Sequence, residues 1–359
     1  MAVNAQTIDE KARSHVLSIR WIISERDDLV WLIGSVSVSY LLMFVYVKGW
    51  LPLLPMMAVW AVGIDGPHVF GTLSRTWFDK TEWAKRRGML LGSLLFFLVG
   101  PVAVLTGHAL EFFFVAALWA YYHLVKQHYG FMVLYKKKNN DLERLDNILD
   151  RALLLLAFTS PFLTFIAVDP QALARVPVQL HGAFASISLA VFAVTIMVFV
   201  AWSSRQVQRF ITGKTLNLPK YLLLAAAIPM HWIALLTPMP FKRIALVAIL
   251  TVYHNIQYHR LIWFHNKKYS GDAAAREQFG PAAVISRSLP VFIGFALLFG
   301  LAYQGPRQYI LGREMSSTTN GTMLVTSVLW GFAFMHYYLD SKIWRVRRDP
   351  SVGKALKMS

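Results

Sequence analysis

The sequence predicts an all-α, polytopic integral membrane protein with about ten transmembrane helices and both termini in the cytoplasm. Its 359 residues are 56% hydrophobic and only 15% charged, which is too apolar for a soluble domain. The net charge of +17 is distributed through the gaps between apolar runs, so we expect no nucleic-acid partner. There is no cysteine, which excludes disulfides and metal sites built from thiolates.

Ten segments are apolar and long enough to cross a bilayer core of roughly 30 Å. These predicted spans are 28–47, 50–73, 88–107, 109–134, 148–168, 182–202, 219–239, 242–264, 283–303 and 321–344. We therefore expect a cytoplasmic segment over 1–27, a single membrane domain over 28–344 and a basic cytoplasmic tail over 345–359. The first segment lacks the short apolar core of a cleaved signal peptide.

The basic residues predict the orientation of these spans. The two termini and every second connection between spans carry 27 Lys and Arg residues in total, whereas the remaining connections carry 6. Because positive charge is retained in the cytoplasm, the richer side is predicted to be cytoplasmic. The expected location is the cytoplasmic (inner) membrane, crossed many times, with the lipid bilayer as the main partner.

Histidines and acidic residues concentrate where four of the spans reach the cytoplasmic side. Placing one ionisable side chain within a membrane span costs a few kcal/mol of insertion free energy. Eight such side chains together therefore indicate a compensating interaction. Imidazole and carboxylate groups bind transition metals, and a shared metal centre is the interpretation that we favour. The expected ligands are His68, His123, His128, His254, His259, His336, Asp340 and Asp65. Possible supporting residues around the ligands are His265, Gln127, Asn255 and Gln257.

The spacing of the histidines constrains this site. His123 and His128, like His254 and His259, are five residues apart, which separates the two directions by about 140° on an α-helix. Such a pair reaches two ions, or one ion if a π-bulge rotates one side chain. His231 stands alone in an apolar span, so we interpret it as a core residue.

These paired boxes resemble the histidine-box di-iron superfamily of fatty-acid desaturases, lipid hydroxylases and alkane hydroxylases. Gln127-His128-Tyr129-Gly130 is similar to the Glu-His-Tyr-Gly stretch of the alkane hydroxylases. The chain also resembles the Brp/Blh family of carotene-cleaving dioxygenases, which use a mononuclear iron, in its size and in its histidine-bearing helices. The resemblance to the superfamily implies two iron ions and an oxygenase activity.

The leading functional hypothesis is thus a non-haem iron oxidoreductase of lipid metabolism. It would use O2 to hydroxylate, desaturate or cleave a lipid-soluble substrate. Hydroxylation or desaturation would need an external electron donor such as a ferredoxin, because a chain without cysteine carries no iron–sulfur cluster of its own. Two alternatives stay open: an electron carrier with haem b or quinone, and a divalent-metal transporter. Zinc is the alternative metal.

Overall fold

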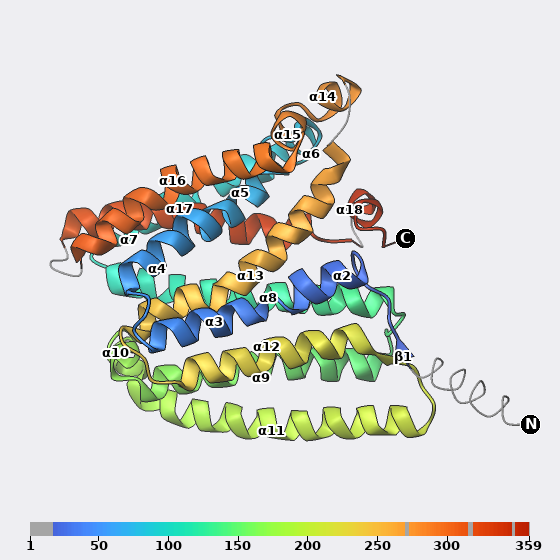
Figure 1. Cartoon of the computed structure of the whole chain (residues 1–359). Coiled ribbons are helices and arrows are strands. Elements are labelled where there is room, and N and C mark those ends of the chain that lie inside the picture. Colours follow the sequence, from blue (N-terminus) through green and yellow to red (C-terminus); the bar gives the residue numbers. More distant parts are fainter. Residues whose placement is uncertain (1–16, 270–272, 315–318, 347–348, 359) are drawn as a thin grey trace, which may run out of the picture. The chain divides into compact units, whose positions relative to one another are not determined.

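The computed structural model describes residues 17–269, 273–314, 319–346 and 349–358, and almost all of them are helical (Figure 1). The contacts divide the chain into two compact units. Unit 1 consists of Met1–Val36 and Leu124–Thr237, and unit 2 of Ser37–His123 and Pro238–Ser359. Each unit is built from two separate stretches of sequence, and the expectation of one membrane domain over 28–344 stays a prediction.

Unit 1 contains the long helices α9, α11 and α12, of which α11 and α12 both pack against α9 (Figure 1). A two-residue parallel pairing joins Leu17 to Leu216 and Ser18 to Asn217. Its elements are β1 (Leu17–Ser18), α2 (Glu25–Asp27), η1 (Asp28–Ile33), α9 (Arg144–Val168), α10 (Pro170–Leu173), η3 (Val178–Leu180), α11 (His181–Ile211), β2 (Leu216–Asn217) and α12 (Leu218–Leu236). The helix α8 (Ala109–Lys138) begins in unit 2 and ends in unit 1.

Unit 2 contains the other long helices, with α16 packed on α5 and α17 packed on α7. Its elements are α3 (Val36–Val47), α4 (Leu53–Trp60), η2 (Ala61–Asp65), α5 (Gly66–Ser74), α6 (Lys80–Ser93), α7 (Phe96–Leu105), α13 (Lys242–Asn266), η4 (Lys267–Tyr269), α14 (Ala273–Phe279), α15 (Pro281–Ile285), α16 (Leu289–Glu314), α17 (Asn320–Ile343) and α18 (Pro350–Ala355). The segment η2 is a π-helix that runs directly into α5.

Eight helical segments of the described chain are long and apolar enough to cross a membrane. They are Glu25–Val47, Leu53–Ser74, Lys80–Leu105, Arg144–Val168, Val178–Ile211, Leu218–Leu236, Leu289–Arg313 and Asn320–Ile343. This confirms the predicted class, an all-α multi-pass membrane protein. The two other predicted spans, 109–134 and 242–264, coincide with α8 and α13, which are as long but more polar.

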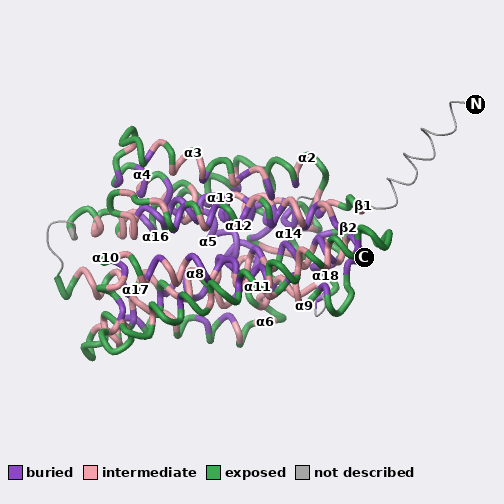
Figure 2. The backbone as a smooth tube through the Cα atoms, turned by 90° about the horizontal axis from the view of Figure 1, so that it is seen from below, coloured by how far each residue is buried: buried purple, intermediate pink, exposed green. Residues whose placement is uncertain are grey.

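The spans differ in how much of their surface is buried within the protein. In the most apolar 18-residue stretch of Leu53–Ser74, 56% of the residues are buried, whereas the corresponding share in Val178–Ile211 is 11%. Most residues of α11 are exposed or half-buried (Figure 2), and many of the exposed ones are apolar. An exposed apolar helix fits a lipid environment, because its backbone is satisfied internally and its side chains favour hydrocarbon. The buried span is therefore the one suited to carry polar side chains inside the protein.

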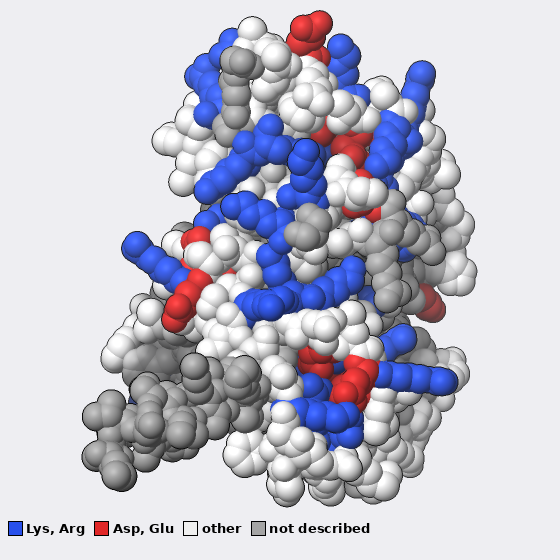
Figure 3. All heavy atoms as spheres, turned by 90° about the vertical axis from the view of Figure 1, so that its right-hand side faces the viewer, with Lys and Arg blue, Asp and Glu red and all other residues white. Residues whose placement is uncertain are grey.

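Charged side chains form ion pairs in both units. Figure 3 shows Lys and Arg side chains in blue, with fewer Asp and Glu side chains in red beside some of them. In unit 2, Lys85 pairs with Asp349 at 2.8 Å, and in unit 1, Lys214 pairs with Glu143 at 2.8 Å. Pairing reduces the cost of holding these charges beside apolar helices.

Candidate metal centre

Two glycines fix the position of α5. A Cβ atom added to Gly66 would lie 2.4 Å from Cα of Gly300, and one added to Gly300 would lie 2.3 Å from the carbonyl oxygen of Val62. Only glycine permits this approach, so the start of α5 touches α16 main chain to main chain. His68 follows within one turn of α5 and is held inside unit 2, where it is 3% exposed.

Four imidazole rings from four helices surround one small volume of unit 2. The ring centre of His68 lies 4.5 Å from that of His336 and 4.9 Å from that of His254. The ring of His123 lies 4.8 Å from His336 and 5.3 Å from His254. The helices α5, α8, α13 and α17 thus each contribute one histidine, and each of them overlaps one of the four spans at whose ends histidines were predicted to gather.

Nitrogen atoms of three of these rings converge. One ligand atom each from His68, His123 and His336 lies within 4.8 Å of the other two. Both ring nitrogens of His68, Nε2 of His123 and Nε2 of His336 are buried, and no described residue hydrogen-bonds to them. Buried polar atoms are rarely left unsatisfied, so these nitrogens are available to a shared ligand.

A hydrogen-bond network fixes the orientation of His336. Its Nδ1 lies 2.7 Å from the hydroxyl oxygen of Thr72, which in turn donates to Asp340 over 2.6 Å. The hydroxyl of Tyr258 donates to the same carboxylate oxygen over 2.7 Å. If Nδ1 carries the proton, Nε2 of His336 retains its lone pair for the cluster. Asp340 therefore orients a histidine through Thr72, and its separation from Nδ1 of His336 is 3.9 Å.

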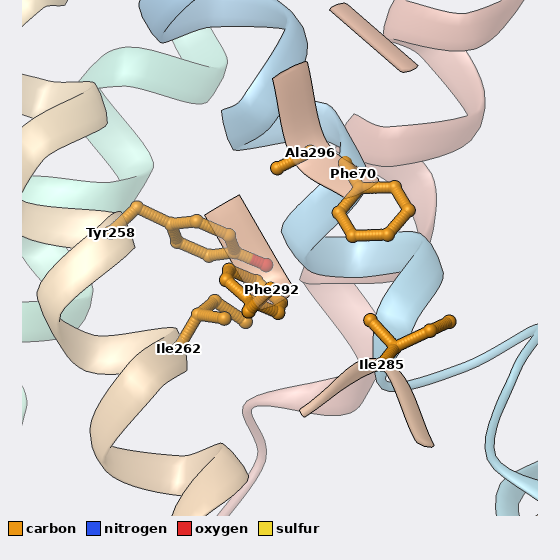
Figure 4. Packing of buried hydrophobic residues seen from close by; sticks show 6 residues of the cluster. All are labelled: Phe70, Tyr258, Ile262, Ile285, Phe292 and Ala296. Atoms are coloured by element: carbon orange, nitrogen blue, oxygen red, sulfur yellow. The ribbon is translucent and has the colours of Figure 1, made fainter. Parts of the chain in front are cut away.

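Packing around Tyr258 keeps this network in place. Tyr258 extends from α13 towards α5 and lies in a buried cluster with Phe70, Ile262 and Phe292 (Figure 4). Its ring also meets that of His68 at a centre distance of 4.5 Å. The tyrosine thus joins the apolar core of unit 2 to the histidine cluster.

Asp65 and His259 lie beside the cluster and have protein partners. The carboxylate of Asp65 accepts hydrogen bonds from Gln304 over 2.6 Å and from Asn255 over 3.4 Å. Nε2 of His259 lies 3.0 Å from the carbonyl oxygen of Ile64 in the π-helix η2, and its ring centre is 6.2 Å from that of His68. Asn255 thus contacts Asp65, and its expected role of supporting a metal ligand stays a prediction.

His128 has different neighbours from the other predicted ligands. Its ring centre lies 5.3 Å from Phe158 and 5.9 Å from His231, all within unit 1. Nδ1 of His128 bonds to the carbonyl of Leu124 on its own helix. The helix α8 is regular through His123 and His128, and α13 is regular through His254 and His259. These described segments therefore lack the π-bulge that would let both histidines of a pair bind one ion.

The remaining predicted residues are placed as follows. His265 is buried at the end of α13, where Nδ1 lies 3.1 Å from Oδ1 of Asn266. Gln257 is buried on α13, and Gln127 is half-buried on α8. His231, interpreted as a core residue, is fully buried, and His108 is exposed.

Three residues that the sequence interpretation did not include contribute to the site. These are Thr72, Tyr258 and Tyr337, whose ring stacks on His123 at 4.3 Å. Thr72 follows His68 by four residues and Tyr258 follows His254 by four, a spacing that places each pair on one helix face. This four-residue spacing is the sequence feature from which Thr72 and Tyr258 could have been identified.

The residues present fit a metal ion. Four imidazoles bound to one ion at about 2.1 Å would have ring centres about 5 Å apart. Four pairs of ring centres among these histidines are 4.5 to 5.3 Å apart, and His68 and His123 are 6.2 Å apart. No family model, no curated protein and no solved structure matches this chain.

Proposed function

We propose that unit 2 binds one transition-metal ion, iron, through His68, His123, His254 and His336. The observation that carries this proposal is the convergence of buried ligand atoms of His68, His123 and His336 within 4.8 Å. Neutral imidazole is a good ligand for iron, copper, nickel and zinc. We propose one ion rather than the two that the resemblance implies, because the convergent ligand atoms belong to His68, His123 and His336. His128 and His259 each lie within hydrogen-bond distance of a main-chain carbonyl group instead.

We propose that the chain is a membrane-embedded oxidoreductase that acts with O2 on a lipid-soluble substrate. Iron bound by these histidines would supply oxygen activation for hydroxylation, desaturation or cleavage of a hydrocarbon. The protein side chains orient the ligands, with Thr72 and Asp340 acting on His336, and the surrounding apolar core keeps water away. Apolar helices exposed to lipid give such a substrate a route from the bilayer. An external donor such as a ferredoxin would supply electrons for hydroxylation or desaturation.

The packing favours a bare ion over haem b. A porphyrin between two axial imidazoles needs a flat space many ångströms wide, whereas the ring of Tyr258 and a second pair of imidazoles lie against His68. In unit 1, the ring centre of Phe158 lies 4.1 Å from that of His231, so the phenylalanine fills space that a porphyrin bound to His231 would need. Zinc shares the preference for imidazole, and the experiment below separates it from iron.

Elemental analysis of the purified protein, with an absorption spectrum, tests this function. We expect about one iron per chain and no haem band. Replacing His68, His123 or His336 by Ala should each reduce iron content to near zero. His108→Ala, an exposed histidine on α8's N-terminal side, is the matched control and should keep the metal. Tight haem, or full iron content in both His123→Ala and His336→Ala, would refute the proposal.

We further propose that all ten long helical segments cross the cytoplasmic membrane and that both termini are cytoplasmic. The alternation of 27 and 6 basic residues between successive connections supports this topology. Reporter fusions after Lys138 and after Ser359 should report a cytoplasmic location, and a fusion near Arg175 an external one. An external location for the fusion after Ser359 would reverse the assignment.

A further inference from the structure

Arg75 is a buried cation that lacks a carboxylate partner. It follows α5 directly and is 1% exposed. One nitrogen, Nη2, donates to the carbonyl oxygen of Ile343 over 3.1 Å, but Nε and Nη1 are buried and have no hydrogen-bond partner among the described residues. A buried guanidinium without a counter-charge is strongly unfavourable, so this group calls for an anion.

Other polar groups near Arg75 also lack a partner. The guanidinium lies 4.0 Å from the ring centre of Trp344, whose indole N–H is buried and makes no hydrogen bond to any described residue. The ring of His265 lies 5.6 Å from the same indole, and its Nε2 is buried and likewise unsatisfied. Nδ1 of His265 is used by Asn266, so Nε2 is the nitrogen that remains for a ligand.

Lys268 adds a second positive charge to this region. Burial and the nearby Arg75 lower the pKa of Lys268 to about 8, although Asp79 acts in the opposite direction. Its side chain keeps 25% of its surface exposed, whereas Arg75 is enclosed. The lysine therefore marks the side on which an ion could enter.

The neighbouring carboxylates have partners other than Arg75, and Oδ2 of Asp79 lies 3.8 Å from Nζ of Lys268. Asp79 caps α6 through Oδ1 and accepts from the hydroxyl of Tyr269 over 2.7 Å through Oδ2. Asp340 accepts from Thr72 and Tyr258. No described carboxylate forms an ion pair with Arg75, and the charge of Asp340 acts on the guanidinium only from a longer distance.

We propose that Arg75, Trp344, His265 and Lys268 form a binding site for a phosphate group. A phosphate offers several oxygens in different directions and accepts from guanidinium, indole and ammonium donors at once. Nε2 of His265 would accept a hydrogen bond from the O–H group of a hydrogen phosphate. The site lies just beyond the end of the span Leu53–Ser74, at the level where phospholipid headgroups are found. Free phosphate and a lipid headgroup share this chemistry, and the site does not depend on a metal at the histidine cluster.

Thermal unfolding of the full-length protein, purified in detergent and freed of phosphate, tests the proposal. In one arm inorganic phosphate is titrated while sodium chloride keeps the ionic strength constant. In the other arm phosphatidylglycerol is added to the micelles, with phosphatidylcholine for comparison. We expect the unfolding midpoint to rise and saturate in at least one arm. A response to phosphate alone identifies the free ion, and a response to phosphatidylglycerol alone identifies the headgroup.

Variants separate this site from general electrostatic effects. Arg75→Gln should abolish the rise, and Trp344→Phe, which keeps an aromatic ring but loses the N–H, should require roughly tenfold more ligand. Arg87→Gln removes an exposed arginine on α6 and should respond like the wild type. If Arg75→Gln does not fold, Trp344→Phe alone decides the question. An unchanged response of Trp344→Phe together with Arg75→Gln, or no response of the wild type in either arm, would overturn the proposal.

Discussion

The hydroxyl oxygen of Thr72 lies 2.7 Å from Nδ1 of His336, which turns the other imidazole nitrogen towards His68 and His123. Replacing Thr72 by Val keeps the shape of the side chain and removes this contact. We expect metal affinity to fall roughly 10–100-fold, as for other groups that orient a metal-bound histidine. Chelator competition measures this affinity. Thr72→Ser retains the hydroxyl and should stay near wild type; equal affinities of the Val and Ser variants would contradict the role.

The crossing of α5 and α16 gives a second prediction. Gly66→Ala would place a methyl group 2.4 Å from Cα of Gly300, so the helices must separate. We expect the free energy of unfolding in detergent to fall by about 1–3 kcal/mol and the metal content to fall with it. Gly63→Ala is the matched control on the same span, because a Cβ there meets no atom within 4 Å. Equal losses of unfolding free energy in Gly66→Ala and Gly63→Ala would contradict this prediction.

A third prediction concerns the buried ion pairs of unit 1. Nζ of Lys220 lies 2.7 Å from Asp141 and 3.0 Å from Asp150, with the lysine and Asp150 both fully buried. Asp141 still pairs with Arg209, and Asp150 still pairs with Lys136. Lys220→Ala therefore removes one buried counter-charge without isolating either carboxylate, and it should cost about 1.5–3 kcal/mol in the free energy of unfolding.

Lys214 provides the comparison for Lys220. It pairs with Glu143 at 2.8 Å, but both side chains are 46% exposed. Lys214→Ala should therefore change the free energy of unfolding by at most about 1 kcal/mol. Denaturant unfolding of Lys220→Ala and Lys214→Ala in the same detergent gives the difference in unfolding free energy. Similar losses in both variants would show that burial does not determine how much each ion pair contributes to stability.

The C-terminal helix α18 should depend on pH. Burial acts to raise the pKa of Asp349, but hydrogen bonds from Lys85 and Ser351 and the charge of Arg86 outweigh it and hold the pKa below its ordinary value. A depressed pKa adds stability above the unfolded value of about 3.9, and this stability is lost as the pH falls through the folded value.

Protection of α18 from proteolysis measures this effect. We expect cleavage near the C-terminus to increase progressively as the pH falls below about 4. Asp349→Asn should be cleaved more readily at neutral pH and should lose less protection over the acidic range. A wild-type profile in the Asn variant would exclude Asp349 as the titrating group.

Much of the helical framework could be predicted from the sequence. All ten predicted spans coincide with long helical segments, because an apolar run of that length has few alternatives in a membrane. The sequence also predicted that His68, His123, His254 and His336 meet, since each lies near the same end of its span. Depth along a helix can be counted from the residue numbers.

Direction around a helix was harder to predict. His128 was expected to join His123, but α8 stays regular and the 140° between them gives His128 the neighbours Phe158 and His231. The hydroxyl of Thr72 was missed because a threonine in an apolar span has many possible partners. Only the packing of α17 on α5 selects His336 among them.

The contact between Thr72 and His336 joins positions 264 residues apart, and this distance has a consequence for biosynthesis. At typical translation rates of about 5–20 residues per second, α17 follows α5 into the membrane after an interval on the order of tens of seconds. During that interval Asp65, His68 and Thr72 enter the bilayer without their later partners. The first stretch of unit 2 therefore lacks its later polar partners while the rest of the chain is synthesised. The histidine cluster forms only after α17 has been inserted, late in assembly.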